Sequence, residues 1–130
     1  MKGYIENIEA ATIANTDFRR VVYTGKHSQL VLMRLRPGEE IGSEVHEGVD
    51  QFFRFEKGEG KVVIDGAEHA VRDGSAAVVP AGAQHNVVNT SATEDLHLYT
   101  IYSPAEHKDK TVHATKAEAV EEHFDGVTTE

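Results

Sequence analysis

The stretch from Gly74 to Asn89, GSAAVVPAGAQHNVVN, decides the fold of this chain. It holds two short β-branched runs separated by Pro80 and Gly82. Proline fixes φ and removes a donor, whereas glycine adopts backbone angles that other residues resist, so the pair predicts a tight turn between two strands. His85 then opens the second strand. A histidine aimed in this way often binds a metal, but a hairpin whose histidine faces water would have the same sequence.

A second segment, from Gly38 to Gly60, carries polar groups that match this histidine. Glu44 and His46 are two residues apart, so on a strand their side chains lie on one face. A polar, glycine-containing break follows, and Gln51 then begins the next strand, which runs to Phe55. These side chains and the later histidine would converge inside a small barrel.

Together the two segments resemble the paired motifs of the cupin superfamily. The second family motif reads Gly, five residues, Pro-x-Gly, two residues, His, three residues, Asn. This chain matches each fixed position at the right spacing, with Gly74, Pro80, Gly82, His85 and Asn89. The resemblance implies an all-β fold, the double-stranded β-helix or jelly roll of the cupin barrel.

The first family motif is matched with two substitutions. It reads Gly, five residues, His-x-His, three or four residues, Glu, six residues, Gly. Gly38, His46 and Gly58 fit in register, whereas Glu44 stands where the first His belongs and Gln51 stands where the Glu belongs. The resemblance therefore extends over residues 38–89, and the metal site is the part that departs from the family pattern.

The resemblance implies one divalent transition metal, Fe, Mn, Ni or Zn, held by Glu44, His46, Gln51 and His85. The family's usual set is three histidines and one carboxylate, and here the carboxylate changes position while its count is kept. Two histidines and a carboxylate with open positions are typical of non-haem Fe(II) sites. A competing interpretation is that both substitutions mark the loss of the site, which leaves a metal-free cavity that binds an organic molecule directly.

Further roles are expected for a few residues near this set. Glu44, if it is not a ligand, would serve as a general base. Gln51 could instead satisfy a buried backbone group. Phe53 and Tyr99 are candidate substrate-binding residues, although Phe53 shares the inward parity of a core residue. The remaining histidines without ligand spacing are expected at the surface: His27, His69, His107, His113 and His123.

The whole chain, residues 1–130, is expected to form one cupin domain. Its core barrel would cover about residues 20–103, and short strands punctuated by Gly and Pro are typical of such a barrel. Asp65-Gly66 predicts a hairpin between two of them. In the tail, 104–130, Thr115 and Glu118 resemble a capping box, so a short C-terminal helix is expected over residues 116–123. Residues 127–130 are expected to fray.

Composition excludes some partners. The chain has 22 acidic and 13 basic residues and a formal net charge of −9, which disfavours nucleic acid and anionic membranes. It has no cysteine, no apolar run of membrane-spanning length and no signal-like apolar stretch near Met1. We therefore expect a cytoplasmic protein without a membrane partner.

Three functions remain open on the sequence. One is a metal-dependent enzyme for a small polar organic substrate, by resemblance an isomerase, dioxygenase, lyase or decarboxylase. The alternative is a non-catalytic small-molecule binding or storage cupin. The third is a structural subunit whose barrel only assembles with partners, which no particular residue favours. A sugar-phosphate isomerase would need a basic residue in the pocket, for which Arg34, Arg36 and Arg54 are the strand candidates, although Arg54 has outward parity. The resemblance also implies a homodimer.

Overall fold

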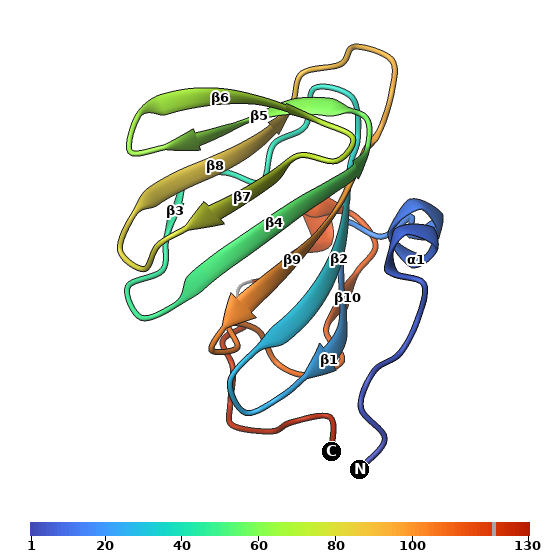
Figure 1. The fold of residues 1–130 in the computed structure, drawn as a ribbon, viewed down its shortest axis with the longest axis vertical. Coiled ribbons are helices and arrows are strands. Elements are labelled where there is room, and N and C mark those ends of the chain that lie inside the picture. Colours follow the sequence, from blue (N-terminus) through green and yellow to red (C-terminus); the bar gives the residue numbers. More distant parts are fainter. Residues whose placement is uncertain (121) are drawn as a thin grey trace.

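Two antiparallel sheets face each other in the computed structural model, which describes residues 1–120 and 122–130 (Figure 1). The six-stranded sheet has the order β10-β1-β2-β9-β4-β7, and the four-stranded sheet has the order β3-β8-β5-β6. The strands are β1 (Arg19–Thr24), β2 (Gln29–Leu35), β3 (Glu44–Val45), β4 (Asp50–Lys57), β5 (Glu59–Ile64), β6 (Ala67–Arg72), β7 (Ala76–Val79), β8 (Gln84–Asn89), β9 (Leu96–Ser103) and β10 (Val112–His113). The all-β prediction is confirmed.

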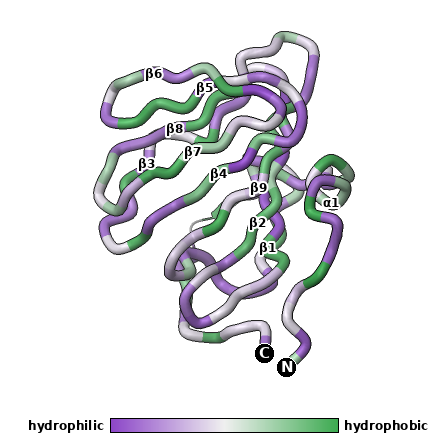
Figure 2. Tube along the Cα trace, viewed as in Figure 1, coloured by the Kyte–Doolittle hydropathy of each residue, from purple (hydrophilic) through white to green (hydrophobic). Residues whose placement is uncertain are grey.

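The core lies between the two sheets and follows the two-residue period of the strands. On β4 the side chains of Gln51, Phe53 and Phe55 point inward and are buried. Val62 and Val87 meet them from the four-stranded sheet. Hydrophobic and hydrophilic residues accordingly alternate along the strands in Figure 2. This alternation fixes which polar residues of β4 enter the interior.

Glycines set the turns and close approaches that the motifs require. Asp65 and Gly66 both have positive φ, of 47° and 83°, which is the geometry of the tight hairpin predicted between β5 and β6. Gly82 has φ of 87° at the corner before β8. At Gly60, a Cβ atom would collide with the backbone carbonyl of Val88. The glycine therefore lets β5 and β8 lie close together.

A helix at the N-terminus, α1 (Ile8–Ala14), was missed by the sequence analysis. Asn7 caps it, since its side-chain oxygen accepts from the N–H of Ala10 at 3.0 Å. The helix packs against β9 and β4 on the outer face of the six-stranded sheet. Among the described residues, no helix is both long enough and apolar enough to cross a bilayer.

The C-terminal tail differs from its prediction. The expected helix over residues 116–123 is a single 3₁₀ turn, η1 (Lys116–Glu118), and Glu121 lies outside the described residues. Thr115 caps it as expected, but Ala119 is already extended. The expected fraying of residues 127–130 is wrong. The carboxylate of Glu130 accepts hydrogen bonds from the backbone of Lys2 and Gly3, and the two termini lie together in Figure 1.

Candidate functional site

Glu44, His46 and His85 meet at one end of the four-stranded sheet. Glu44 on β3 is the direct cross-strand partner of His85 on β8. His46 follows β3 at once, and its ring centroid lies 5.3 Å from that of His85. The expected common face of Glu44 and His46 is thus present, and the two sequence motifs come together in space.

The orientation of His85 is set by its own strand corner. Its Nδ1 lies 3.1 Å from the carbonyl oxygen of Ala83. A carbonyl only accepts, so Nδ1 carries the proton and Nε2 keeps its lone pair. A histidine that ligates a metal is usually held in this way, with the other ring nitrogen donating to a carbonyl or carboxylate. The ring is 4% exposed and also contacts Phe53.

Gln51 is buried, and only one end of its amide has a partner. Nε2 donates to the hydroxyl of Thr100 at 3.0 Å, whereas Oε1 has no hydrogen-bond partner. A buried polar atom without a partner destabilises the fold, because its hydration is lost and nothing replaces it. The sequence left open whether Gln51 satisfies a buried backbone group. Gln51 instead donates a hydrogen bond to the Thr100 side chain. Its Oε1, the atom that would coordinate a metal, has no hydrogen-bond partner among the described residues.

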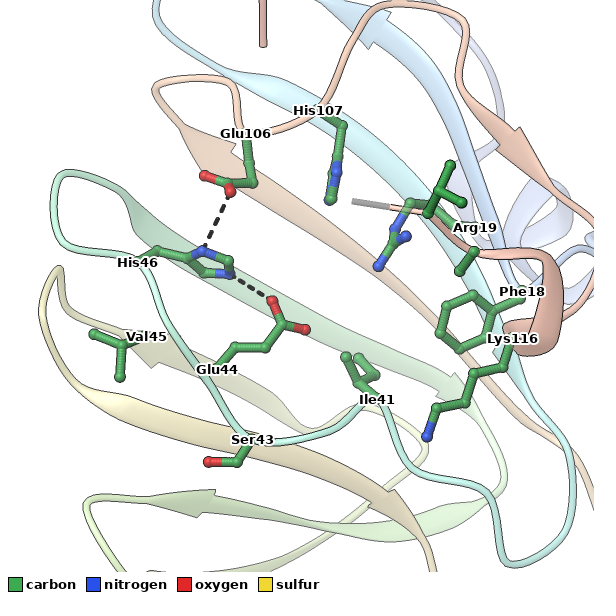
Figure 3. Close-up of a pocket in the computed structure, with 12 residues that line it drawn as sticks. Phe18, Arg19, Ile41, Ser43, Glu44, Val45, His46, Glu106, His107 and Lys116 are labelled. Atoms are coloured by element: carbon green, nitrogen blue, oxygen red, sulfur yellow. Dashed lines mark ion pairs between the residues drawn. The ribbon is translucent and has the colours of Figure 1, made fainter. Parts of the chain in front are cut away.

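His46 lies between two carboxylates. Its Nε2 is 3.0 Å from Oε2 of Glu44, and its Nδ1 is 3.5 Å from Oε1 of Glu106 (Figure 3). Burial opposes protonation of the ring, but the carboxylates of Glu106 and Glu44 outweigh it and raise the pKa of His46 to about 9. The contact with Glu44 is short but poorly aligned, so Nε2 has an ionic partner without a hydrogen bond.

His46 lowers the pKa of both carboxylates. Burial acts to raise the pKa of Glu44, but His46, Arg19 and His85 together hold it below its usual value. The hydrogen bond from His46 lowers the pKa of Glu106 in the same direction. Both groups are therefore ionised at neutral pH, and Glu44 is in the state that a general base requires.

A cavity of about 470 Å³ opens beside His46. Glu44, His46 and Glu106 form one side of it, and Figure 3 shows Arg19, Phe18 and Lys116 on the other. The other lining residues are Ile41, Ser43, Val45, His107, Ala119 and Val120. His85 and Gln51 do not line it; the His85 ring lies 5.3 Å from the His46 ring at an interplanar angle of 52°. The cavity is large enough for a small organic molecule.

The two residues expected to bind substrate do not line this cavity. Phe53 is fully buried in the core between Phe55 and His85. Tyr99 has the opposite parity to Thr100 on β9 and contacts Phe52 on the outer face of the sheet. Tyr102 is the tyrosine of β9 beside the site, with its ring 5.8 Å from that of His46. The residues of β9 that face the interior are those in register with Leu98 and Thr100, and Tyr102 belongs to this set.

The tail supplies residues that sequence reasoning missed. Glu106 reaches His46, and the following residue, His107, is buried, with Nε2 3.2 Å from the hydroxyl of Tyr102. The expected surface position of His107 and His113 is therefore wrong: His107 is held against β2 by Gln29, and His113 lies on β10, which pairs with β1. His27, His69 and His123 are exposed, as expected. Nothing in the local spacing of these tail residues points to the site.

The donors at the site are not arranged as a finished metal centre. Within the part of the chain that the structure describes, no three His, Cys, Asp or Glu side chains surround a common point as metal ligands. The chemistry of the donors nevertheless fits one ion. Two imidazoles, one carboxylate and an amide oxygen are a nitrogen and oxygen donor set that a divalent transition metal accepts. The 3.0 Å between His46 Nε2 and Glu44 Oε2 is the distance of an ion pair.

Comparison with known proteins agrees with the fold. The family model of the Cupin domain matches residues 31–102. The uncharacterized protein YrkC of Bacillus subtilis is 49% identical over 125 residues, which cover 92% of this chain and 67% of that protein.

Two solved structures extend the comparison. A Bacillus halodurans protein, 43% identical, superposes with a TM-score of 0.87 over 89% of this chain and 92% of its own. A predicted oxalate decarboxylase from Thermotoga maritima, 25% identical, gives a TM-score of 0.58 over 61% of this chain and 68% of its own. The matched family region contains both sequence motifs and all of the strands from β3 to β8. The chain belongs to the cupin family.

Proposed function

We propose that this cupin binds one divalent transition metal through Glu44, His46 and His85, with Gln51 as a fourth donor, and uses it on a small polar organic substrate. The observation that carries the proposal is the pair of buried atoms without hydrogen-bond partners, Nε2 of His46 and Oε1 of Gln51. Both are metal-donor atoms, and both belong to family ligand positions. An ion at this place would give Oε1 of Gln51 a partner and would replace the ionic contact of 3.0 Å that Nε2 of His46 makes with Glu44.

The donor set favours a metal that accepts mixed nitrogen and oxygen ligands. Two imidazoles and one carboxylate suit Fe(II) and also Mn(II), Ni(II) or Zn(II). His85 supports the proposal further, because its Nδ1 is tied to Ala83 and only Nε2 is available. A bound ion would displace the proton that Glu44 and Glu106 hold on His46, so binding should release protons.

The chain's own residues define what happens in the cavity. When bound, a divalent ion would act as a Lewis acid that polarises a substrate oxygen. With Glu44 bound to the ion, the ionised carboxylate of Glu106 would accept a proton from a substrate that lies beside His46. The similarity to a predicted oxalate decarboxylase supports chemistry of the lyase type among the enzyme classes expected from the sequence.

A second candidate, a metal-free binding module, has its own support. His46 already has two carboxylate partners, and the resulting ion pairs hold it as a cation at neutral pH. In such a protein the cavity would bind an organic molecule directly through these charged groups.

Metal titration separates the two candidates. Chelator-treated protein is titrated with Fe(II), Mn(II), Ni(II) and Zn(II) by calorimetry, and the metal content of protein as purified is measured by elemental analysis. We expect one ion per chain in the wild type and its loss in His85→Ala. His69→Ala is the matched control, since His69 is exposed on β6. Metal that persists in His85→Ala, or is absent from the wild type while an organic ligand co-purifies, would contradict the proposal.

A further inference from the structure

Arg19 is a buried cation in the cavity that forms no ion pair with a carboxylate of the described residues, although its charge acts on Glu44 from a longer distance. Its residue is 8% exposed, and it lines the cavity together with Phe18, whose ring lies 5.2 Å from the guanidinium carbon. Nε has no hydrogen-bond partner, and no ion pair to Arg19 occurs among the described residues. A buried guanidinium normally has a carboxylate or phosphate partner, because an unpaired buried charge is costly.

The one polar contact of Arg19 leaves its charge in place. Nη1 lies 3.3 Å from Nδ1 of His113, its cross-strand partner on β10. Since a guanidinium only donates, Nδ1 of His113 must accept, and it therefore carries no proton. A neutral acceptor orients the guanidinium without neutralising it. Nε has no hydrogen-bond partner among the described residues but is shielded from solvent, so an anion in the cavity would meet the outer nitrogens of the guanidinium.

The cavity has a cationic side, with Arg19 and Lys116, and an anionic side, with Glu44 and Glu106. In Figure 3 the guanidinium points into the cavity, toward the side on which Glu44 lies, and Lys116 enters from the same side as Phe18. Lys116 has no ion pair within the described part of the chain. The opposite side holds Glu44 and Glu106 around His46. Between the two sides, Ile41 and Phe18 provide apolar contact.

We propose that the ligand of this cavity is a small organic acid whose carboxylate pairs with the guanidinium of Arg19. A guanidinium fork matches the two oxygens of a carboxylate, and the pair would neutralise the buried charge. Phosphate or a dicarboxylate fits less well than a monocarboxylate, because Glu44 and Glu106 share the cavity and would repel a second negative charge. The inference rests on the proposed function only for the position of the ligand beside His46.

The test compares matched arginine variants. Binding of small carboxylates (acetate, oxalate, succinate and benzoate), of their amides and of inorganic phosphate is measured by calorimetry, with metal-free and metal-loaded protein. Arg19→Gln removes the charge, and Arg19→Lys keeps it but loses the fork. Arg20→Gln is the control, since Arg20 is the next residue of β1, faces outward and pairs with Asp17 at 2.9 Å. Thermal unfolding verifies that each variant is folded.

We expect at least one carboxylate to bind the wild type and Arg20→Gln, and its amide to bind neither. Arg19→Gln should weaken this binding by about 10- to 100-fold, and Arg19→Lys should weaken it less. Equal binding to Arg19→Gln and wild type, tighter binding of phosphate than of any carboxylate, or no binding by any probe would overturn the inference. Carboxylate binding that depends on Arg19 in protein that never takes up metal would support the inference and contradict the proposed metal site.

Discussion

Asn89, the last residue of the second motif, should be a major contributor to stability. The residue is 1% exposed. Its Nδ2 donates to the carbonyls of Leu35 at 3.0 Å, Arg36 at 3.0 Å and Glu94 at 2.9 Å, and its Oδ1 accepts from the N–H of Ser91 at 3.0 Å. One amide thus joins the end of β2 to the loop before β9. Because Nδ2 has two hydrogens for three carbonyls, one hydrogen is shared.

Asn89→Ala removes these bonds and leaves buried carbonyls without a donor. The two hydrogens of Nδ2 and the N–H of Ser91 make three bonds, worth about 1 kcal/mol each, and a carbonyl left unsatisfied costs a further 1–3 kcal/mol, so the free energy of unfolding should fall by about 4–6 kcal/mol. Asn89→Asp should be worse at pH 7, since its carboxylate would face three carbonyl oxygens. Urea unfolding measures both changes.

Asn86→Ala is the control for this prediction. The side chain of Asn86 on β8 is half-buried, and its Oδ1 accepts one hydrogen bond, from the N–H of Gly42 at 2.9 Å. Its loss should lower the free energy of unfolding by about 1 kcal/mol. If Asn89→Ala costs no more than Asn86→Ala, or if Asn89→Asp is the more stable Asn89 variant at pH 7, the account of Asn89 is wrong.

Three further outcomes are expected. Gly60→Ala should destabilise the fold by more than about 2 kcal/mol in urea unfolding, because the new Cβ would collide with the carbonyl of Val88; a neutral result would show that β5 and β8 can separate. Burial, followed by the charge of Arg19, lowers the pKa of His107 to about 3, so the unfolded chain binds a proton between pH 6.5 and 3 that the folded chain does not. The free energy of unfolding should therefore decrease as the pH falls through this window. Between pH 7 and 4.5 the decrease should be about 2–3 kcal/mol smaller in His107→Gln than in wild type. Equal decreases in urea unfolding would mean that His107 is not the group responsible. Gln51→Glu should change the metal affinity or preference in calorimetry, and an unchanged titration would mean that Gln51 serves only to bind Thr100.

The strands could be predicted because their signals are local. The turn at Asp65-Gly66, the corner at Pro80 and Gly82, and the alternation on β4 each depend on a few neighbouring residues. The pairing of Glu44 with His85 also followed from the two motifs, since each motif fixes the position of one strand.

The cavity wall could not be predicted, because it is built by segments far apart in the chain. Glu106 reaches His46 from the tail, and Arg19 enters from the first strand. The sequence analysis sought the pocket arginine among Arg34, Arg36 and Arg54, but Arg34 bonds Thr16 and Asp95, and Arg54 pairs with Glu56. No spacing rule links β1 to the tail.

The orientation of Tyr99 could not be predicted, because both faces of β9 are covered. On β9, Leu96 to Leu98 are all buried, since one face meets the core and the other face is covered by α1. The hydropathy of β9 therefore does not tell which set of residues faces inward. Recognising α1 from its cap, Asn7, would have resolved the parity and pointed to Tyr102 in place of Tyr99.

Anomalous diffraction from crystals of Mn- or Fe-loaded protein would locate the ion that Glu44, His46 and His85 are proposed to hold. One anomalous peak per chain is expected, about 2.0–2.3 Å from Nε2 of both histidines and from a carboxylate oxygen of Glu44. Crystals with metal in the solution but no peak between these side chains, or with the peak elsewhere and His46 still paired with Glu44 and Glu106, would contradict the proposed metal site.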